Sequence, residues 1–212
     1  MKDIFVVFDV ETGGLNSEVN PVLEIACIFV EQNENKDLIV SDKVKSIDYM
    51  ILPNYLPDYQ IEKDALVTNG INMSYIEKYG IPSRKFIDEL LEKMQELNIN
   101  NTFSSRKKNS YKNFYLVGHN ISNFDVMFLE KMFQENGKNL YDYFNRALID
   151  TYILSKMMFS KNDKIANLKL ETVCNFLKIR LNNAHTAYGD AFANAQMFIK
   201  IYNFFQNENL RM

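Results

Sequence analysis

The segment Ile4–Val10, with the sequence IFVVFDV, constrains the fold most strongly because it is apolar on both faces of a β-strand. Such a strand must be covered on both sides, so it belongs inside a layered sheet. A second strand is expected at residues 22–31. Alternation of apolar and polar residues predicts a third strand at residues 44–52. The connections are too short for crossover helices, so the three strands should form an antiparallel meander.

Helical periodicity dominates after this meander. Residues 83–97 place their apolar side chains on one helical face, and residues 114–118 (FYLVG) predict a fourth strand. A helix over residues 123–135 should begin at Ser122 or Asn123 and end near Gly137. Three more helices are expected, at about residues 150–158, 168–177 and 187–205. Strands followed by strand–helix alternation indicate an α/β fold with a sheet covered by helices.

Length and composition limit the class of protein. A chain of 212 residues suits one domain, and we expect it to span residues 1–212, with a polar, basic insertion at 98–113 and a short tail at 206–212. The net charge of −3 gives no general attraction for nucleic acid, so an anionic substrate would need a local basic patch or a metal.

Cys27 and Cys174 lie in apolar stretches and indicate reduced core residues. No signal peptide or membrane-spanning run is visible, which favours a cytoplasmic protein.

Acidic residues stand beside apolar strands at several points, where they are costly unless a cation lies between them. Asp9 and Glu11 are two residues apart on a strand, so both side chains point to the same face. They lie at its carboxyl end, where open α/β sheets place their ligands. The alternative is that Glu11 and the following Thr12, Gly13 and Gly14 only make a polar strand end and turn.

Each remaining candidate also has a structural alternative. Asp125 follows Ser122 by three residues, which is a capping-box spacing, and an acid in the first turn of a helix is stabilising. However, the strand end before it should carry it to the sheet edge where Asp9 lies. Asp190 could cap the last helix, and His185 could be a surface-loop residue.

Together these segments resemble the DEDDh family of 3′–5′ exonucleases, which includes replicase proofreading subunits, ribonuclease T and oligoribonuclease. The resemblance spans nearly the whole chain in the family's order. The family's first motif, D-x-E-T-x-G, is matched by Asp9, Glu11, Thr12 and Gly14. The second, G-H-N followed by F-D, is matched by Gly118, His119, Asn120, Phe124 and Asp125. The third, H-x-A-x-x-D-A, is matched by His185, Ala187, Asp190 and Ala191. The resemblance implies a ribonuclease-H-like fold, with a mixed central sheet that begins with the meander and has helices on both faces.

The resemblance also implies the chemistry. Asp9, Glu11, Asp125 and Asp190 would hold two Mg²⁺ or Mn²⁺ ions, which prefer oxygen ligands and which cut phosphodiesters when paired. His185 would be the general base, since histidine titrates near neutral pH. Substrate contacts are expected at seven positions: Thr12, Gly13, Gly14, Leu15, His119, Asn120 and Phe124. Asp150 is expected to be a supporting acid at a helix N-terminus, and Glu24 is expected to be structural.

The insertion at 98–113 is rich in cations, which indicates a solvated loop or a contact with the nucleic-acid backbone. The candidates for that contact are Arg106, Lys107, Lys108 and Lys112.

The expected partner is the 3′ end of a nucleic acid, above all single-stranded DNA, with RNA as the alternative. A polymerase is a further candidate partner, and the protein is expected to be a monomer or homodimer. The sequence thus predicts a metal-dependent 3′–5′ exonuclease that releases nucleoside 5′-monophosphates. The alternatives are a non-catalytic binding module for nucleic acid or polymerase on the same scaffold, and an unrelated α/β protein.

Overall fold

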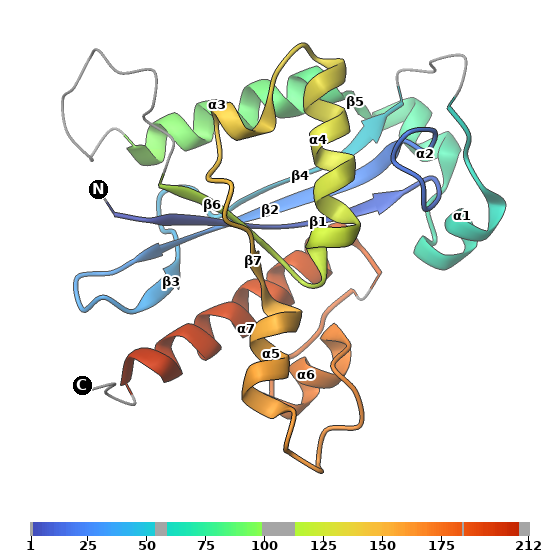
Figure 1. Ribbon diagram of the computed structural model, residues 1–212. Helices are drawn as coiled ribbons and strands as arrows, with labels where there is room; N and C mark the ends of the chain where they lie inside the picture. Colours follow the sequence, from blue (N-terminus) through green and yellow to red (C-terminus); the bar gives the residue numbers. More distant parts are fainter. Residues whose placement is uncertain (1, 54–58, 99–112, 184, 208–212) are drawn as a thin grey trace.

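A mixed β-sheet forms the centre of the protein, as the computed structural model shows for residues 2–53, 59–98, 113–183 and 185–207 (Figure 1). Its strand order is β5-β4-β2-β1-β6-β7, and β3 pairs with β2 beside this path. The strands are β1 (Ile4–Thr12), β2 (Val22–Gln32), β3 (Leu38–Val40), β4 (Ser46–Leu52), β5 (Ile81–Pro82), β6 (Phe114–Gly118) and β7 (Ile149–Asp150). The pairs β1–β2 and β2–β4 are antiparallel, so the predicted meander is confirmed, whereas β6 runs parallel to β1.

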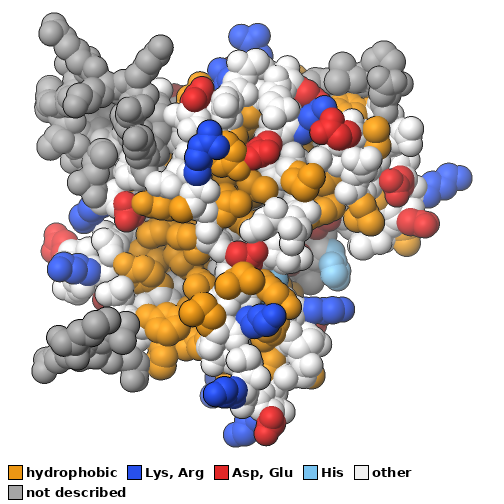
Figure 2. All heavy atoms as spheres, in the orientation of Figure 1, with side chains coloured by type: hydrophobic (Ala, Val, Ile, Leu, Met, Phe, Trp, Pro, Cys, Tyr) orange, Lys and Arg blue, Asp and Glu red, His pale blue; other side chains and the backbone are white. Residues whose placement is uncertain are grey.

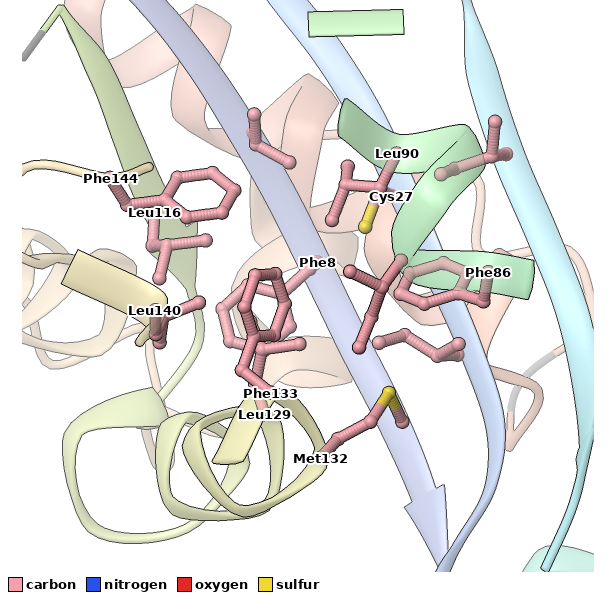
Figure 3. Packing of buried hydrophobic residues seen from close by; sticks show 14 of the residues in the cluster. Phe8, Cys27, Phe86, Leu90, Leu116, Leu129, Met132, Phe133, Leu140 and Phe144 are labelled. Carbon is pink, nitrogen blue, oxygen red and sulfur yellow. The ribbon is translucent and has the colours of Figure 1, made fainter. Parts of the chain in front are cut away.

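Helices cover both faces of this sheet, as predicted (Figure 1). Alternate residues of β1 divide between the two faces: Ile4, Val6, Phe8 and Val10 point to one, and Phe5 and Val7 to the other. The first face packs against α3 (Ser83–Asn98) and α4 (Asp125–Glu135), where Figure 3 shows Phe8 among Phe86, Leu129 and Phe133. The second face packs against α7 (Ala187–Asn207). Full burial of one such side chain contributes about 1.5–3 kcal/mol, which explains why β1 is central.

A lobe below the sheet contains α5 (Thr151–Phe159) and α6 (Leu170–Phe176), which pack against α7 in a separate apolar cluster (Figure 1). The expected helices at 150–158, 168–177 and 187–205 therefore exist with bounds shifted by one or two residues. Asp150 caps α5, because its side chain accepts a hydrogen bond from the Tyr152 backbone N–H.

Two helices were not predicted: α1 (Lys63–Asn69) and α2 (Met73–Tyr79). No residue of α1 is buried and α2 buries only Ile76, so neither has the apolar periodicity that marks a helix in a sequence. The strands β3, β5 and β7 were also missed, because two or three residues are too few to show a pattern.

The start of α4 also differs from the prediction. Ser122 and Asn123 lie in a 3₁₀ turn, η2 (Ile121–Asn123), and the residue that precedes α4 is Phe124, without a side-chain cap. The predicted cap at Ser122 or Asn123 is therefore wrong, while the predicted end near Gly137 is correct. A second 3₁₀ turn, η3 (Leu140–Asp142), follows α4. Within the described ranges, no helix has the length and apolarity needed to cross a membrane.

Candidate active site

The end of β1 supplies the first two acidic residues of the candidate site. Pairing between β1 and β6 ends at Val7, so the rest of β1 extends past its neighbour. Asp9 and Glu11 lie on the α7 side of this strand end, as their alternation with Phe8 and Val10 requires. The strand therefore presents two carboxylates at a sheet edge.

The first turn of α7 brings Asp190 to the same place. One carboxylate oxygen from each of Asp9, Glu11 and Asp190 can be chosen so that all three lie within 4.8 Å of one another. Close approach of the helix is allowed by small residues one turn apart, since Ala187, Ala191 and Ala195 are fully buried against the sheet.

The N-terminus of α7 is held by two acceptors. The Thr186 hydroxyl accepts a hydrogen bond from the Gly189 N–H at 3.1 Å. Glu24 on β2 is buried, and the Ala187 N–H beside its carboxylate offsets part of the rise in pKa that burial causes. The prediction that Glu24 is structural agrees with this contact, which anchors the helix that carries Asp190.

Asp125 approaches the cluster from the other side, as the first residue of α4. Its carboxylate receives the backbone N–H of Val10 and its own N–H, and its charge acts on Asp9. The preceding turn is compact, since Asn120 has a left-handed backbone conformation and its N–H donates to Asp150 Oδ1 at 2.8 Å. Asp150 therefore fixes both the start of α5 and the turn that leads to Asp125.

The electrostatic state of these acids reflects burial and mutual repulsion. Burial, followed by the charges of Asp125 and Asp190, raises the pKa of Asp9 well above its usual range. Burial and then the charge of Asp190 raise the pKa of Glu11 to about 8. Burial raises the pKa of Asp125 to about 7, despite the N–H groups that favour its charged form. Such a cluster is strained when every member is ionised, and divalent cations would relieve it.

His185 lies beside Asp190, at the loop that enters α7. Its side chain is exposed and its backbone φ is 65°, a left-handed conformation that is uncommon outside glycine. Burial raises the pKa of Asp190, whereas the backbone N–H and the charge of His185 lower it. The structure therefore brings the histidine to the acidic cluster.

Comparison with known proteins adds independent information. The ribonuclease T family profile, described as an exonuclease, matches residues 99–198. A PolC-type DNA polymerase III of Clostridium perfringens is 30% identical over 92% of this chain, and a ribonuclease T of Wigglesworthia glossinidia brevipalpis is 29% identical over 93%. Escherichia coli exonuclease I in complex with a dT13 oligonucleotide superposes over 97% of the chain with a TM-score of 0.69 at 16% identity.

The chain contains a ribonuclease T-type exonuclease domain, and it resembles the DEDDh 3′–5′ exonucleases in sequence and fold. It spans 84% of that ribonuclease T, but only 11% of the PolC-type polymerase and 43% of exonuclease I. The predicted family resemblance and the predicted ribonuclease-H-like fold are confirmed.

The acidic cluster fits the divalent metal that DEDDh exonucleases use. Hard divalent cations select carboxylate oxygens, and three such oxygens converge here, with a fourth carboxylate, that of Asp125, beside Asp9. Burial and the neighbouring acids raise the pKa of Asp9 and of Glu11, and a bound cation would offset both effects. Asp9, Glu11, Asp125 and Asp190 could therefore hold metal.

A cavity of about 390 Å³ adjoins the cluster and contains most of the predicted substrate residues. Glu11, Thr12, Gly14, Leu15 and Phe124 line it from the sheet side. The Thr12 hydroxyl donates to the Gly14 carbonyl at 2.7 Å, which fixes the turn, and the Gly13 carbonyl accepts from the Glu62 N–H at 2.7 Å. Leu15 is 81% exposed, so an apolar group stands at the mouth of the cavity.

The opposite wall of this cavity was missed in the sequence. It consists of residues around α1: Glu62, Asp64, Ala65, Thr68 and Asn69. Asn69 Nδ2 donates to the Thr12 carbonyl at 3.2 Å, which attaches the helix to the end of β1. The sequence signal that could have revealed this helix is the pair Asn69-Gly70, because Gly70 ends α1 with a positive φ.

The other predicted substrate residues lie differently. Both ring nitrogens of His119 have protein partners: Nδ1 lies 3.0 Å from Thr151 Oγ1, and Nε2 lies 2.8 Å from the Leu168 carbonyl. Asn120 is exposed in the turn before α4. Their substrate contacts stay predictions. The four cations of the insertion lie outside the described residues: Arg106, Lys107, Lys108 and Lys112.

Proposed function

We propose that the protein is a metal-dependent 3′–5′ exonuclease that hydrolyses the 3′-terminal phosphodiester of single-stranded or frayed DNA, with short RNA as the alternative substrate, and releases nucleoside 5′-monophosphates. The observation that carries this proposal is the convergence of Asp9, Glu11 and Asp190 within 4.8 Å at the carboxyl end of β1. Resemblance to the DEDDh exonucleases supports the reaction, and the oligonucleotide bound to exonuclease I supports the substrate class.

The proposed cofactor is a pair of Mg²⁺ or Mn²⁺ ions held by Asp9, Glu11, Asp125 and Asp190. When bound, the ions supply Lewis acidity that activates a water molecule and neutralises charge on the leaving 3′ oxygen. The four acidic residues orient the scissile phosphate by holding these ions. Glu24 contributes by keeping α7, and thus Asp190, against the sheet.

His185 accepts the proton of the attacking water in this proposal. It lies in an exposed position beside Asp190, so it can reach a phosphate that is seated on the acidic cluster. The bond from its backbone N–H to Asp190 couples the loop to the metal ligand.

The terminal nucleotide occupies the cavity beside Glu11. Its base packs between Leu15 and Phe124, and the backbone of Thr12 and Gly14 lines its sugar. Apolar packing of this kind does not discriminate among bases, which suits an exonuclease without sequence preference.

The biological setting belongs to the same proposal. The relatives include both ribonuclease T and a much longer PolC-type polymerase. We therefore propose a cytoplasmic exonuclease domain, monomeric or dimeric, that works alone or beside a polymerase.

The proposal is tested by digestion of matched 5′-labelled single-stranded DNA and RNA, each with Mg²⁺, with Mn²⁺ and with EDTA. Asp190→Asn is compared with Asp142→Asn, which removes one exposed acid outside the cluster. A ladder that shortens from the 3′ end, needs metal, and is lost only in Asp190→Asn supports the exonuclease. If no strand is shortened with either metal, the proposal fails, and the non-catalytic binding module becomes the better assignment.

A further inference from the structure

The lobe of α5 and α6 is strongly cationic. Residues 156–180 contain six lysines and arginines against two acidic residues, a net charge of +4. Because the whole chain carries −3, the rest of it carries −7. Figure 2 shows Lys and Arg side chains distributed over this lower lobe, with a histidine side chain near them.

These cations are available to a ligand. All six side chains are exposed: Lys156, Lys161, Lys164, Lys169, Lys178 and Arg180. Of the salt bridges found among the described residues, none involves them. Unpaired exposed cations gathered on one lobe create a positive potential that reaches about 8 Å in physiological salt.

The lobe lies next to the candidate active site, as two interactions indicate. The Leu168 carbonyl receives His119 Nε2 at 2.8 Å, and Lys169 is the next residue. The charge of Glu171, at the start of α6, acts on Asp190. Residues 178–183 then lead from the end of α6 towards His185, so Arg180 lies on the chain segment that enters the site.

The acidic site creates a need for such a surface. Asp9, Glu11, Asp125 and Asp190 repel the phosphates of an incoming strand, and bound metal neutralises them only locally. Phosphates further along the strand need cations of the protein itself, and exposed lysines and arginines provide most of the affinity for a nucleic-acid backbone.

We propose that the α5–α6 lobe binds the phosphodiester backbone of the substrate strand behind its 3′ end, through Lys164, Lys169 and Arg180. This inference rests on the proposed function, since it takes a single-stranded nucleic acid as the ligand. The lobe guides the strand into the site by charge, without reading its sequence.

The test is binding of a 5′-fluorescein oligothymidylate of about 15 nucleotides, measured by anisotropy in EDTA from low to high salt. The triple variant Lys164→Gln, Lys169→Gln, Arg180→Gln is compared with Lys43→Gln, Lys45→Gln, Lys85→Gln. The control removes three exposed cations outside the α5–α6 lobe, two from the segment that precedes β4 and one from α3. Glutamine retains most of each side-chain stem, so the folds are preserved.

The lobe variant should bind about ten- to a hundredfold more weakly at low salt, and its slope of log K against log salt should fall by about 2, since each lost contact removes roughly 0.7. The control should stay within about twofold of the wild type. The proposal would be overturned if both variants lost the same affinity, or if the lobe variant lost none. It would also be overturned if the wild type showed no salt-dependent binding.

A parallel assay separates this inference from the proposed function. With Mg²⁺, the lobe variant should hydrolyse a dinucleotide as the wild type does but show a raised KM for the longer strand. If the wild type cleaves neither substrate while the anisotropy result holds, the exonuclease proposal fails and the lobe assignment stands.

Discussion

Glu11 on β1 and Glu24 on β2 are direct cross-strand partners, so two carboxylates face each other at the end of the antiparallel pair. Like charges in this arrangement are destabilising. Burial is the largest cause of the raised pKa of both side chains, and each has further acids nearby. The sheet therefore tolerates the pair only because one member can bind a proton or share a cation.

The pH dependence of stability follows from this pair. The pKa of Glu11 rises from its usual 4.5 to about 8, so between these values the folded protein binds a proton more tightly than the unfolded chain does. The stabilisation is complete at low pH and is lost as pH rises to 8. In EDTA, the melting temperature should fall from pH 5 to pH 8, and Mg²⁺ should reverse the fall.

Glu11→Gln isolates this contribution, because glutamine cannot ionise. At pH 8 in EDTA it should melt roughly 2–6 °C above the wild type, whereas the exposed Glu34→Gln should match the wild type. Thermal melts monitored by circular dichroism across pH 5–9 measure the difference. Identical pH profiles for the wild type and Glu11→Gln would contradict the role of this pair.

Asp190→Asn should lower kcat by at least about a thousandfold while the protein stays folded, because the substitution keeps the shape but removes a charged oxygen ligand. Metal affinity, measured by calorimetry with Mn²⁺, should fall in parallel. Asp142→Asn should change neither quantity. A variant that keeps wild-type turnover would exclude Asp190 from the metal site.

His185→Asn should lower kcat by about 10²–10⁴-fold and leave Mn²⁺ affinity nearly unchanged, as expected for a general base. Asparagine is the suitable replacement because it tolerates the left-handed backbone conformation, φ 65°, that His185 adopts. If the variant instead loses most of its Mn²⁺ affinity, His185 is a metal ligand and the general-base role is wrong.

Thr151→Val should destabilise the fold by about 1–3 kcal/mol, because it removes a buried hydroxyl with several partners. That hydroxyl lies 3.0 Å from the Gly118 carbonyl, 2.7 Å from Asn194 Oδ1 and 3.0 Å from His119 Nδ1, so it joins β6, α5 and α7. Urea denaturation measures the loss. The matched control is Thr172→Val, whose hydroxyl bonds only the exposed Asn167 and should contribute little.

The sequence by itself determined the type of β-sheet at the centre of this protein. The apolar run of β1 required a covered sheet, and the short links required a meander, because both consequences depend on periodicity and chain length alone. The motif spacing also identified the family. Five acidic or histidine positions could be named because the motifs resemble those of the family, and strand alternation places two of them, Asp9 and Glu11, on one face.

Only the tertiary structure decided how these residues are supported. No local pattern shows that Glu24 meets the N-terminus of α7, or that Thr151 bonds Asn194, since these partners are far apart in the sequence. The wall formed by α1 was invisible for a related reason. None of its residues is fully buried, and Asn69 holds the helix to the end of β1 through a hydrogen bond, so the helix has no apolar stripe to reveal it. Long-range contacts, unlike periodicity, exist only once the chain has folded.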